Sequence, residues 1–244
     1  MSSFSSQIRP FSPQQFLDSG LAAVHFIPQT LLLVIVPFVV SIAVGLVIAV
    51  IRVWRVPVIA RLLQIVTTLV RGIPVYLLLV VSNILYDRYF DVVARHFGWT
   101  VRKSDTGLLN LALVVLSVAF IPVAAEFLRG ALLSVPDSQY EAGYASGLTR
   151  LQILRRIIIP QMIPEAIPSI SNMTVSLIKA SALTSAIGVM DILNESIRSA
   201  SYNYNLLEAY LAAALIYWAL AVGIELIMKA AAVRTGRFKA AVAG

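Results

Sequence analysis

The sequence predicts an all-helical membrane protein, a single domain of about five transmembrane helices over residues 1–244. Hydrophobic residues make up 59% of the chain and charged residues only 13%, whereas a soluble domain has about 25% charged residues. The apolar residues also gather in long runs, several of which reach the roughly 20 residues that a helix needs to cross a bilayer. Lipid is therefore the expected surroundings of this chain.

The composition also excludes several kinds of function. The absence of cysteine excludes disulfides, a thiolate nucleophile and a cysteine metal site. With only His25 and His96, a histidine metal site is not expected either. The net charge of +7 raises the question of nucleic acid, but Lys and Arg interleaved with apolar runs are typical of membrane proteins, and we expect no nucleic-acid partner.

Each transmembrane helix is predicted from an apolar run. The five predicted spans are 27–51, 57–81, 108–133, 169–193 and 206–232. The first contains no charged residue. The charged residues of the other four are, in order, Arg61 and Arg71; Glu126 and Arg129; Lys179 and Asp191; and Glu208, Glu225 and Lys229. The polar residues before the first span do not resemble a cleavable signal peptide, so this helix is expected to stay in place.

The distribution of basic residues predicts that the N-terminus lies outside and the C-terminus in the cytoplasm. The inner segments then hold Arg52, Arg55, Arg61, Arg129, Arg150, Arg155, Arg156, Lys229, Arg234, Arg237 and Lys239. The outer segments hold the smaller set Arg9, Arg88, Arg95, Arg102, Lys103 and Arg198. An odd number of spans keeps this bias, because it places the two termini on opposite sides.

The segment 134–168, between the third and fourth spans, has its own pattern. Pro136 and Asp137 indicate a helix start, and Gly147 indicates a left-handed stop. Thr149 then caps a second helix, in which Leu151, Leu154 and Ile158 form an apolar stripe. Pro160, Pro164 and Pro168 are expected to interrupt the helix where the chain returns to the bilayer. We therefore expect a helix, a glycine turn and a helix at the cytoplasmic surface.

This segment resembles a motif of ABC importer permeases. It reads Glu141-Ala142-Gly143, three residues, Gly147, nine residues, Ile157, one residue, Ile159-Pro160. In that family the pattern is E-A-A, three residues, G, nine residues, I, one residue, L-P, so every spacing agrees. Only Gly143 and Ile159 depart from it.

Neighbouring sequences are similar to the polar-amino-acid subfamily of these permeases, which includes importers of the histidine, glutamine, arginine and cystine type. The chain has Arg71-Gly72-Ile73-Pro74 where the subfamily has R-G-T-P, and Lys179-Ala180-Ser181-Ala182-Leu183 where it has K-D-T-S-L. The resemblance covers roughly residues 19 to 235. Ala180 in place of Asp is a departure at a position that could otherwise contact substrate.

The resemblance implies a type I ABC importer permease fold and a multi-pass protein of the bacterial inner membrane. It implies as partners two ATP-binding subunits, a second permease subunit, identical or a paralogue, and a solute-binding protein outside. The chain would form half of the path for an amino acid or amino-acid derivative. It would bind no cofactor itself, because ATP and Mg²⁺ would be hydrolysed by the partner ATPase.

By the same resemblance, the ATPase-coupling residues are Glu141, Ala142, Gly143, Gly147, Ile157 and Pro160. The small Ala142 and Gly143 suit close approach to another protein, and Glu141 offers a charge-assisted hydrogen bond. The alternative is an amphipathic helix that lies on lipid, which the basic residues of 150–156 would also suit.

Charges inside spans are costly and often functional, and four of them are candidates for the substrate path. Lys179 either lines the path or pairs with an acid such as Glu126 or Glu208. Arg71 either contacts substrate or stabilises a helix near Gly72. Glu126 is expected to pair with Arg129 three residues later, and Asp191 is expected near the solvated outer end of its helix.

No catalytic set is present. The chain lacks the phosphate-binding pattern G-x-x-x-x-G-K-[ST] and a nucleophile with its base, so it is not expected to be an enzyme. The alternative function is a secondary transporter or channel that works alone, which the lack of an internal repeat disfavours. A structural membrane scaffold would not need the motif spacing.

Overall fold

The computed structural model describes residues 10–100, 103 and 106–242, with side chains as far as Val233. Its elements are the helices α1 (Pro13–Val24), α2 (Ile27–Val53), α3 (Ile59–Arg71), α4 (Val75–His96), α5 (Leu108–Leu133), α6 (Ser138–Ala145), α7 (Arg150–Ile153), the π-helix η2 (Leu154–Ile158), α8 (Ile159–Ser181), the 3₁₀ helix η3 (Ala182–Ile187), α9 (Ile192–Ala200) and α10 (Leu206–Val242). Arg9 and Arg102, used for the orientation, lie outside the described residues, as do the side chains of Arg234, Arg237 and Lys239.

Three helices in the described part of the chain are long and apolar enough to cross a membrane unaided: α2, α5 and α10. The helix α5 coincides with the predicted span 108–133. The helices α2 and α10 begin at the predicted residues and continue beyond the predicted ends. Two bent helix pairs raise the number of candidate spans to five.

The predicted second span, 57–81, is wrong as one continuous helix. The structure has α3 and α4, which are bent by 95° at a short break. Pro74 has no N–H to donate into a helix and pushes the preceding Ile73 away from helical conformation. The helix α3 therefore ends at Arg71, with Gly72 as its C-cap, and the next helix begins at Val75.

The predicted fourth span, 169–193, also has the wrong bounds. The helix α8 begins ten residues earlier, at Ile159, and Pro164 and Pro168 lie inside it. Prolines are tolerated in membrane helices because neighbouring groups satisfy the freed carbonyls. The span ends in η3 at the left-handed Gly188 (φ 86°), and a 48° bend leads to α9.

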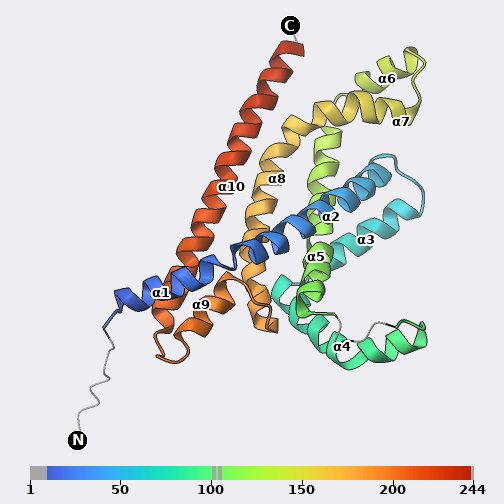
Figure 1. Ribbon diagram of the computed structural model, residues 1–244. Coiled ribbons are helices and arrows are strands. Elements are labelled where there is room, and N and C mark those ends of the chain that lie inside the picture. Colours follow the sequence, from blue (N-terminus) through green and yellow to red (C-terminus); the bar gives the residue numbers. More distant parts are fainter. Residues whose placement is uncertain (1–9, 101–102, 104–105, 243–244) are drawn as a thin grey trace, which may run out of the picture.

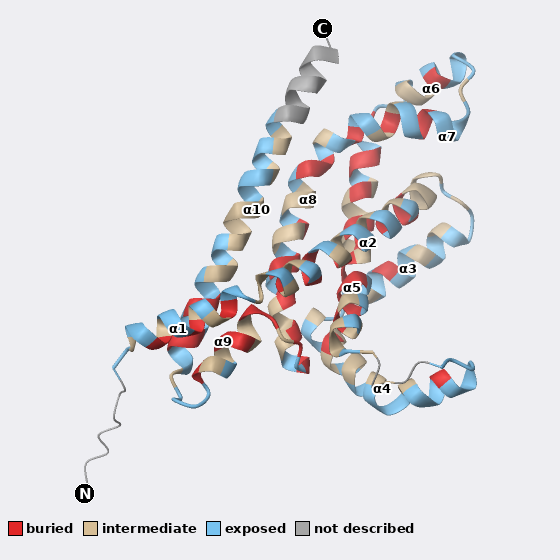
Figure 2. Cartoon of the chain, in the orientation of Figure 1, coloured by how far each residue is buried: buried red, intermediate tan, exposed pale blue. Residues whose placement is uncertain are grey.

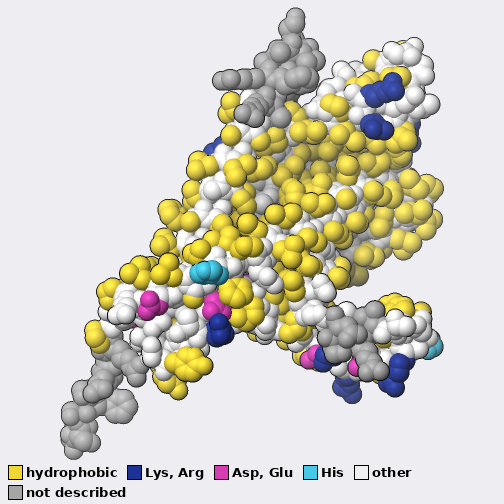
Figure 3. Space-filling view, in the orientation of Figure 1, with side chains coloured by type: hydrophobic (Ala, Val, Ile, Leu, Met, Phe, Trp, Pro, Cys, Tyr) yellow, Lys and Arg dark blue, Asp and Glu magenta, His cyan; other side chains and the backbone are white. Residues whose placement is uncertain are grey.

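The two ends of the molecule are formed by different helices (Figure 1). The helices α6 and α7 lie at the end where α10 terminates, and α1 and α9 lie at the opposite end. Hydrophobic side chains cover the middle of the face in Figure 3, whereas Lys, Arg, Asp and Glu gather near its two ends. Such a band is expected of a protein whose middle lies in hydrocarbon.

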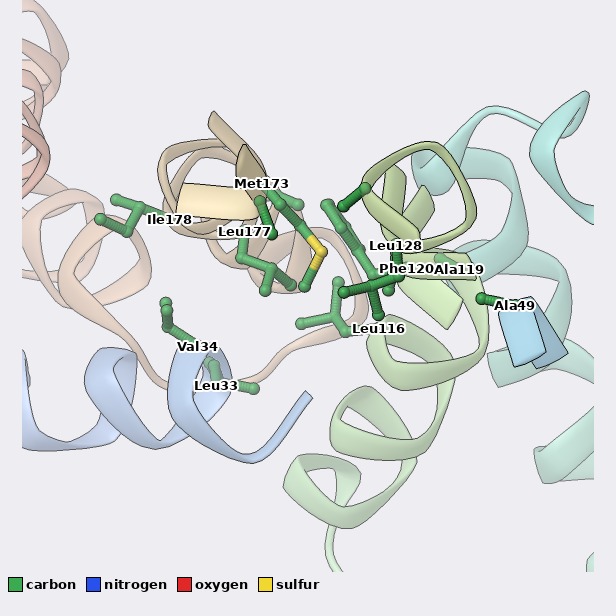
Figure 4. Packing of buried hydrophobic residues seen from close by; sticks show 14 of the residues in the cluster. Leu33, Val34, Ala49, Leu116, Ala119, Phe120, Leu128, Met173, Leu177 and Ile178 are labelled. Carbon is green, nitrogen blue, oxygen red and sulfur yellow. The ribbon is translucent and has the colours of Figure 1, made fainter. Parts of the chain in front are cut away.

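The core is built around α5, which packs between α2 and α8 (Figure 4). Gly45 of α2 faces α5 so closely that an added Cβ would lie 2.7 Å from the Cβ of Ala124, as small residues permit between membrane helices. Leu116 of α5 and Leu177 of α8 are fully buried. By contrast, only 11% of the most apolar part of α10 is buried (Figure 2), so this helix offers a free surface.

Candidate functional site

The segment between α5 and α8 has the predicted helix–turn–helix form. The helix α6 ends before Gly147, whose φ of 74° is left-handed, a conformation that glycine adopts freely. Thr149 then caps α7: its hydroxyl accepts from the Gln152 N–H, and the Gln152 side chain accepts from the Thr149 N–H. This reciprocal capping box gives the second helix a defined start.

The second helix of this segment does not stop where we expected. The helix α7 runs through η2 into α8 without a break in helical conformation, so the prolines do not separate it from the span. Helical structure therefore connects Arg150 to α8, although the helix axis turns between α7 and α8 (Figure 1).

Internal packing explains Gly143, which we had assigned to close approach with another protein. A Cβ at this position would lie 2.6 Å from Cγ1 of Ile153, because α6 folds back on α7. The expected apolar stripe is correct at Leu154 and Ile158, which are buried, and wrong at Leu151, which is 65% exposed. The fully buried Ile153 takes its place.

The remaining motif residues lie mostly at the surface of this segment. Glu141, Ala142 and Gly147 are exposed, as is Pro160, whereas Ile157 is half-buried against the core. A charged, a small and a turn residue are thus free to contact a partner.

A cavity of about 310 Å³ lies between α3, α5 and α8. Its polar wall consists of Arg71, Glu126, Ser169, Asn172 and Ser176, and apolar residues of α5 and α8 complete it. Two of the four charged candidates for the substrate path, Arg71 and Glu126, are therefore brought together across about 55 residues of sequence.

Glu126 makes the expected ion pair and a second one. Its Oε1 accepts from Arg129 at 2.7 Å, and its Oε2 accepts from Arg52 of α2 at 2.8 Å. The Arg52 side chain is only 12% exposed. This carboxylate therefore ties α2 to α5 at the cavity wall, and it is surrounded by more positive than negative charge.

Lys179 lies in the last turn of α8 and is exposed. Among the described residues it makes no ion pair: Glu126 is bound to the two arginines, and Glu208 accepts from the Ser12 N–H. Lys179 continues the row of Ser169, Asn172 and Ser176, which recurs every three or four residues. This spacing places all four on one face of the helix.

Asp191 is not where we expected it. Instead of lying in solvent, it is fully buried. One oxygen accepts from the Asn194 N–H as the cap of α9, and the other accepts from the Tyr217 hydroxyl of α10 at 2.7 Å. Both oxygens are thus engaged inside the protein, and Asp191 joins α9 to α10.

Sequence reasoning missed the neutral members of the cavity wall and the partner Arg52. The signal for Asn172 and Ser176 was present, because polar residues three and four apart in an apolar run mark one helix face. No local pattern could have paired Arg52 with Glu126, which lies 74 residues further along the chain. Within the described residues, no group of three or more His, Asp or Glu is placed to hold a metal ion.

Comparison with known proteins identifies the family. Residues 41–237 match the binding-protein-dependent transport system inner membrane components. The chain belongs to this family. The permease is 32% identical to the probable amino-acid permease protein YxeN of Bacillus subtilis, over 82% of this chain and 84% of the relative. It is 30% identical to the L-cystine transport system permease protein TcyL of the same species, over 84% of each chain.

Solved structures confirm the predicted fold. A crystal structure of an amino acid ABC transporter with histidines aligns with the permease at a TM-score of 0.74 and 21% identity. The alignment covers 92% of this chain and 99% of that one. The fold is therefore that of a type I ABC importer permease.

Proposed function

We propose that this permease forms, with a second permease subunit, the path for an amino acid or amino-acid derivative. A solute-binding protein outside would deliver the substrate. Two ATP-binding subunits inside would bind and hydrolyse ATP with Mg²⁺ and so drive the change between outward- and inward-facing states. The family and the fold support this assignment, and the relatives' names support an amino-acid substrate.

The exposed polar face of α8 is the observation that carries the proposal. Asn172, Ser176 and Lys179 are exposed on a helix of a spanning pair. Lipid cannot hydrogen-bond these groups, and a charge in hydrocarbon is costly. They are accommodated if this face meets water and a second permease subunit, so that the path lies between the two subunits.

The segment 134–168 would couple this path to the ATP-binding subunits. Glu141 and Ala142 are exposed on α6, and α6 packs on α7 through Gly143 and Ile153. Because α7 continues into α8, a movement of the ATP-binding subunit would tilt the helix that carries the polar face. This continuity supports a lever rather than an amphipathic helix that lies on lipid.

The proposed location is the bacterial inner membrane, with the N-terminus outside and the C-terminus in the cytoplasm. The helices α6 and α7 lie at the same end as the end of α10, opposite α1 (Figure 1). This arrangement, with the excess of basic residues predicted for the inner segments, supports the orientation.

Reconstitution tests the proposed function. The permease is co-expressed with its ATPase and second permease subunit, placed in proteoliposomes, and supplied with its binding protein and labelled amino acids. We expect uptake that requires both ATP and the binding protein. ATP-independent uptake by the permease alone would refute the proposal, and so would the absence of uptake for every amino acid that the binding protein retains.

A further inference from the structure

In the part of the chain that the structure describes, the cavity wall carries one cation, Arg71, and one acid, Glu126, which is bound by Arg52 and Arg129; Lys179 is a further cation on α8. We propose that the permease selects substrates that carry net negative charge, such as an amino acid with a second carboxylate, over cationic ones. This inference rests on the proposed function, because it assumes that the cavity between α3, α5 and α8 and the adjoining face of α8 form part of the substrate path.

Among the described residues, Glu126 is the only acid in the cavity wall, and its charge is already compensated. Arg52 and Arg129 bind its two oxygens at 2.8 and 2.7 Å. Charge-assisted hydrogen bonds of this length are strong, so Glu126 has little attraction left for a cationic side chain. The three groups together contribute a net positive charge.

Two further cations near this wall have no acidic partner among the described residues. Arg71 lines the cavity directly. Lys179 lies on α8 one turn beyond the lining residue Ser176, a rise of about 4.5 Å along the helix axis. A guanidinium can bind a carboxylate with two parallel hydrogen bonds, and an ammonium acts as a compact positive charge.

The remaining polar groups of the wall do not offset this charge. Ser169, Asn172 and Ser176 are neutral and either donate or accept hydrogen bonds. The neighbouring cavity, which shares Asn172, contains Glu225 together with the basic Lys229 one turn later. Glu165, on the same helix, already has an interaction partner. Neither Glu165 nor Glu225 lines the cavity between α3, α5 and α8.

A cleft with an excess of one sign of charge concentrates ligands of the opposite sign. A zwitterionic amino acid gains at its carboxylate beside Arg71, whereas a cationic side chain is repelled by Arg71 and, further along α8, by Lys179. A second carboxylate instead gains an attraction. Discrimination by charge therefore follows from the cavity itself and adds to any selection that the binding protein makes.

The test uses the complete complex of permease subunits and ATPase in nanodiscs, without binding protein. Radiolabelled L-glutamate, L-glutamine and L-arginine serve as probes, since they are of similar length and differ in side-chain charge. We expect glutamate to bind at least about tenfold more tightly than arginine, with glutamine between them, and glutamate affinity to fall as salt is added.

Variants connect the preference to the named residues. Arg71→Gln and Lys179→Met are each expected to weaken glutamate binding by about tenfold and to affect glutamine less. The charge-conserving variants Arg71→Lys and Lys179→Arg should retain most of the glutamate affinity. Arg88→Gln, which removes an exposed cation on α4, is the matched control and should change nothing.

Equal binding of the three probes, a preference for arginine, or no glutamate binding at millimolar concentration would each overturn the inference. The proposed function is judged separately by ATP-driven uptake in proteoliposomes. If uptake proceeds and arginine is preferred, only the charge selection is wrong. If no ATP-driven uptake occurs with the binding protein present, the proposed function itself fails.

Discussion

The guanidinium of Arg150 lies over the indole ring of Trp54, 4.4 Å from the ring centroid. This contact joins the first residue of α7 to the turn between α2 and α3. Two residues before Trp54, Arg52 binds Glu126 at the cavity wall. The segment proposed to meet the ATPase is therefore connected to the cavity by a second route besides α8.

The surroundings of this contact are strained and incompletely hydrogen-bonded. Arg55 and Val58 in the same turn have positive φ angles of 51° and 66°, which are unfavourable for residues with side chains. The Trp54 Nε1–H and the Tyr140 hydroxyl are buried without a hydrogen-bond partner among the described residues, and burial raises the pKa of Tyr140. Such features mark a junction that could rearrange during transport.

We expect Trp54→Leu and Arg150→Gln each to reduce ATP hydrolysis stimulated by the loaded binding protein. The double variant should be no worse than either single one, because both remove the same stack. A double-mutant cycle on the stimulated rate should give a coupling of about 0.5–1 kcal/mol. Trp54→Phe keeps a ring and is the control. Strictly additive effects would show that the stack does not transmit the signal.

Gly147→Val is expected to leave membrane insertion and binding-protein docking intact but to abolish stimulated ATP hydrolysis and uptake. A side chain at its left-handed φ of 74° costs about 1–2 kcal/mol, and β-branched residues fit worst. Gly147→Asn, which tolerates this conformation, should retain activity. Full stimulation in Gly147→Val would disprove the lever.

Gly143→Ala should also impair coupling, for a different reason. Its Cβ would lie 2.6 Å from Cγ1 of Ile153, so α6 must move away from α7. Adding Ile153→Ala removes the opposing atoms and should recover part of the stimulated ATP hydrolysis. Gly130→Ala is the matched control, because nothing lies within 4 Å of its added Cβ. If the double variant is worse than both single ones, this packing is not what requires glycine.

Single cysteines in the cysteine-free chain test the orientation. Asp137→Cys, at the start of α6, should react with an impermeant reagent only in inside-out vesicles. Tyr202→Cys, in the turn after α9, is the paired site, because Tyr202 is 90% exposed and should react only in right-side-out cells. Labelling of both from the same side would contradict the orientation.

Asp191→Ala is expected to lower stability rather than to change substrate recognition. It removes the cap of α9 and leaves the half-buried Tyr217 hydroxyl without the Asp191 acceptor, a loss of about 2–3 kcal/mol. A thermal-unfolding measurement of the complex should show a lower midpoint, while the KM for uptake stays unchanged. A raised KM with a normal midpoint would return Asp191 to the substrate path. Tyr217→Phe, which keeps the ring, should be milder.

Several elements could be predicted because their cause is local. A long, mostly apolar run between Gly107 and Ser134 defines α5, and its bounds were predicted to the residue. The turn at Gly147 and the cap at Thr149 follow from residue types whose preferred conformations are known. The motif residues were found by their resemblance to the motif of ABC importer permeases, with which they share every spacing, and their contacts with a partner remain a prediction.

Other features depend on residues that are distant in sequence. Hydropathy merged α3 with α4, because an average over a window does not register the single missing N–H of Pro74. Gly143 was assigned to a partner protein because its actual neighbour, Ile153, is reached only when α6 folds back. Asp191 was placed in solvent because nothing near it in sequence indicates that Tyr217 covers it.

The sequence by itself determined that the chain is a helical membrane protein, where most spans begin, and to which family it belongs. These features depend on hydropathy, capping and motif spacing, which involve residues only a few helical turns apart. Only the tertiary structure decided that Arg71 and Glu126 share a cavity, that Arg52 compensates Glu126, and that α8 exposes a polar face. Whether a charged side chain is paired or free depends on its neighbours in space, and helix packing determines which residues those neighbours are.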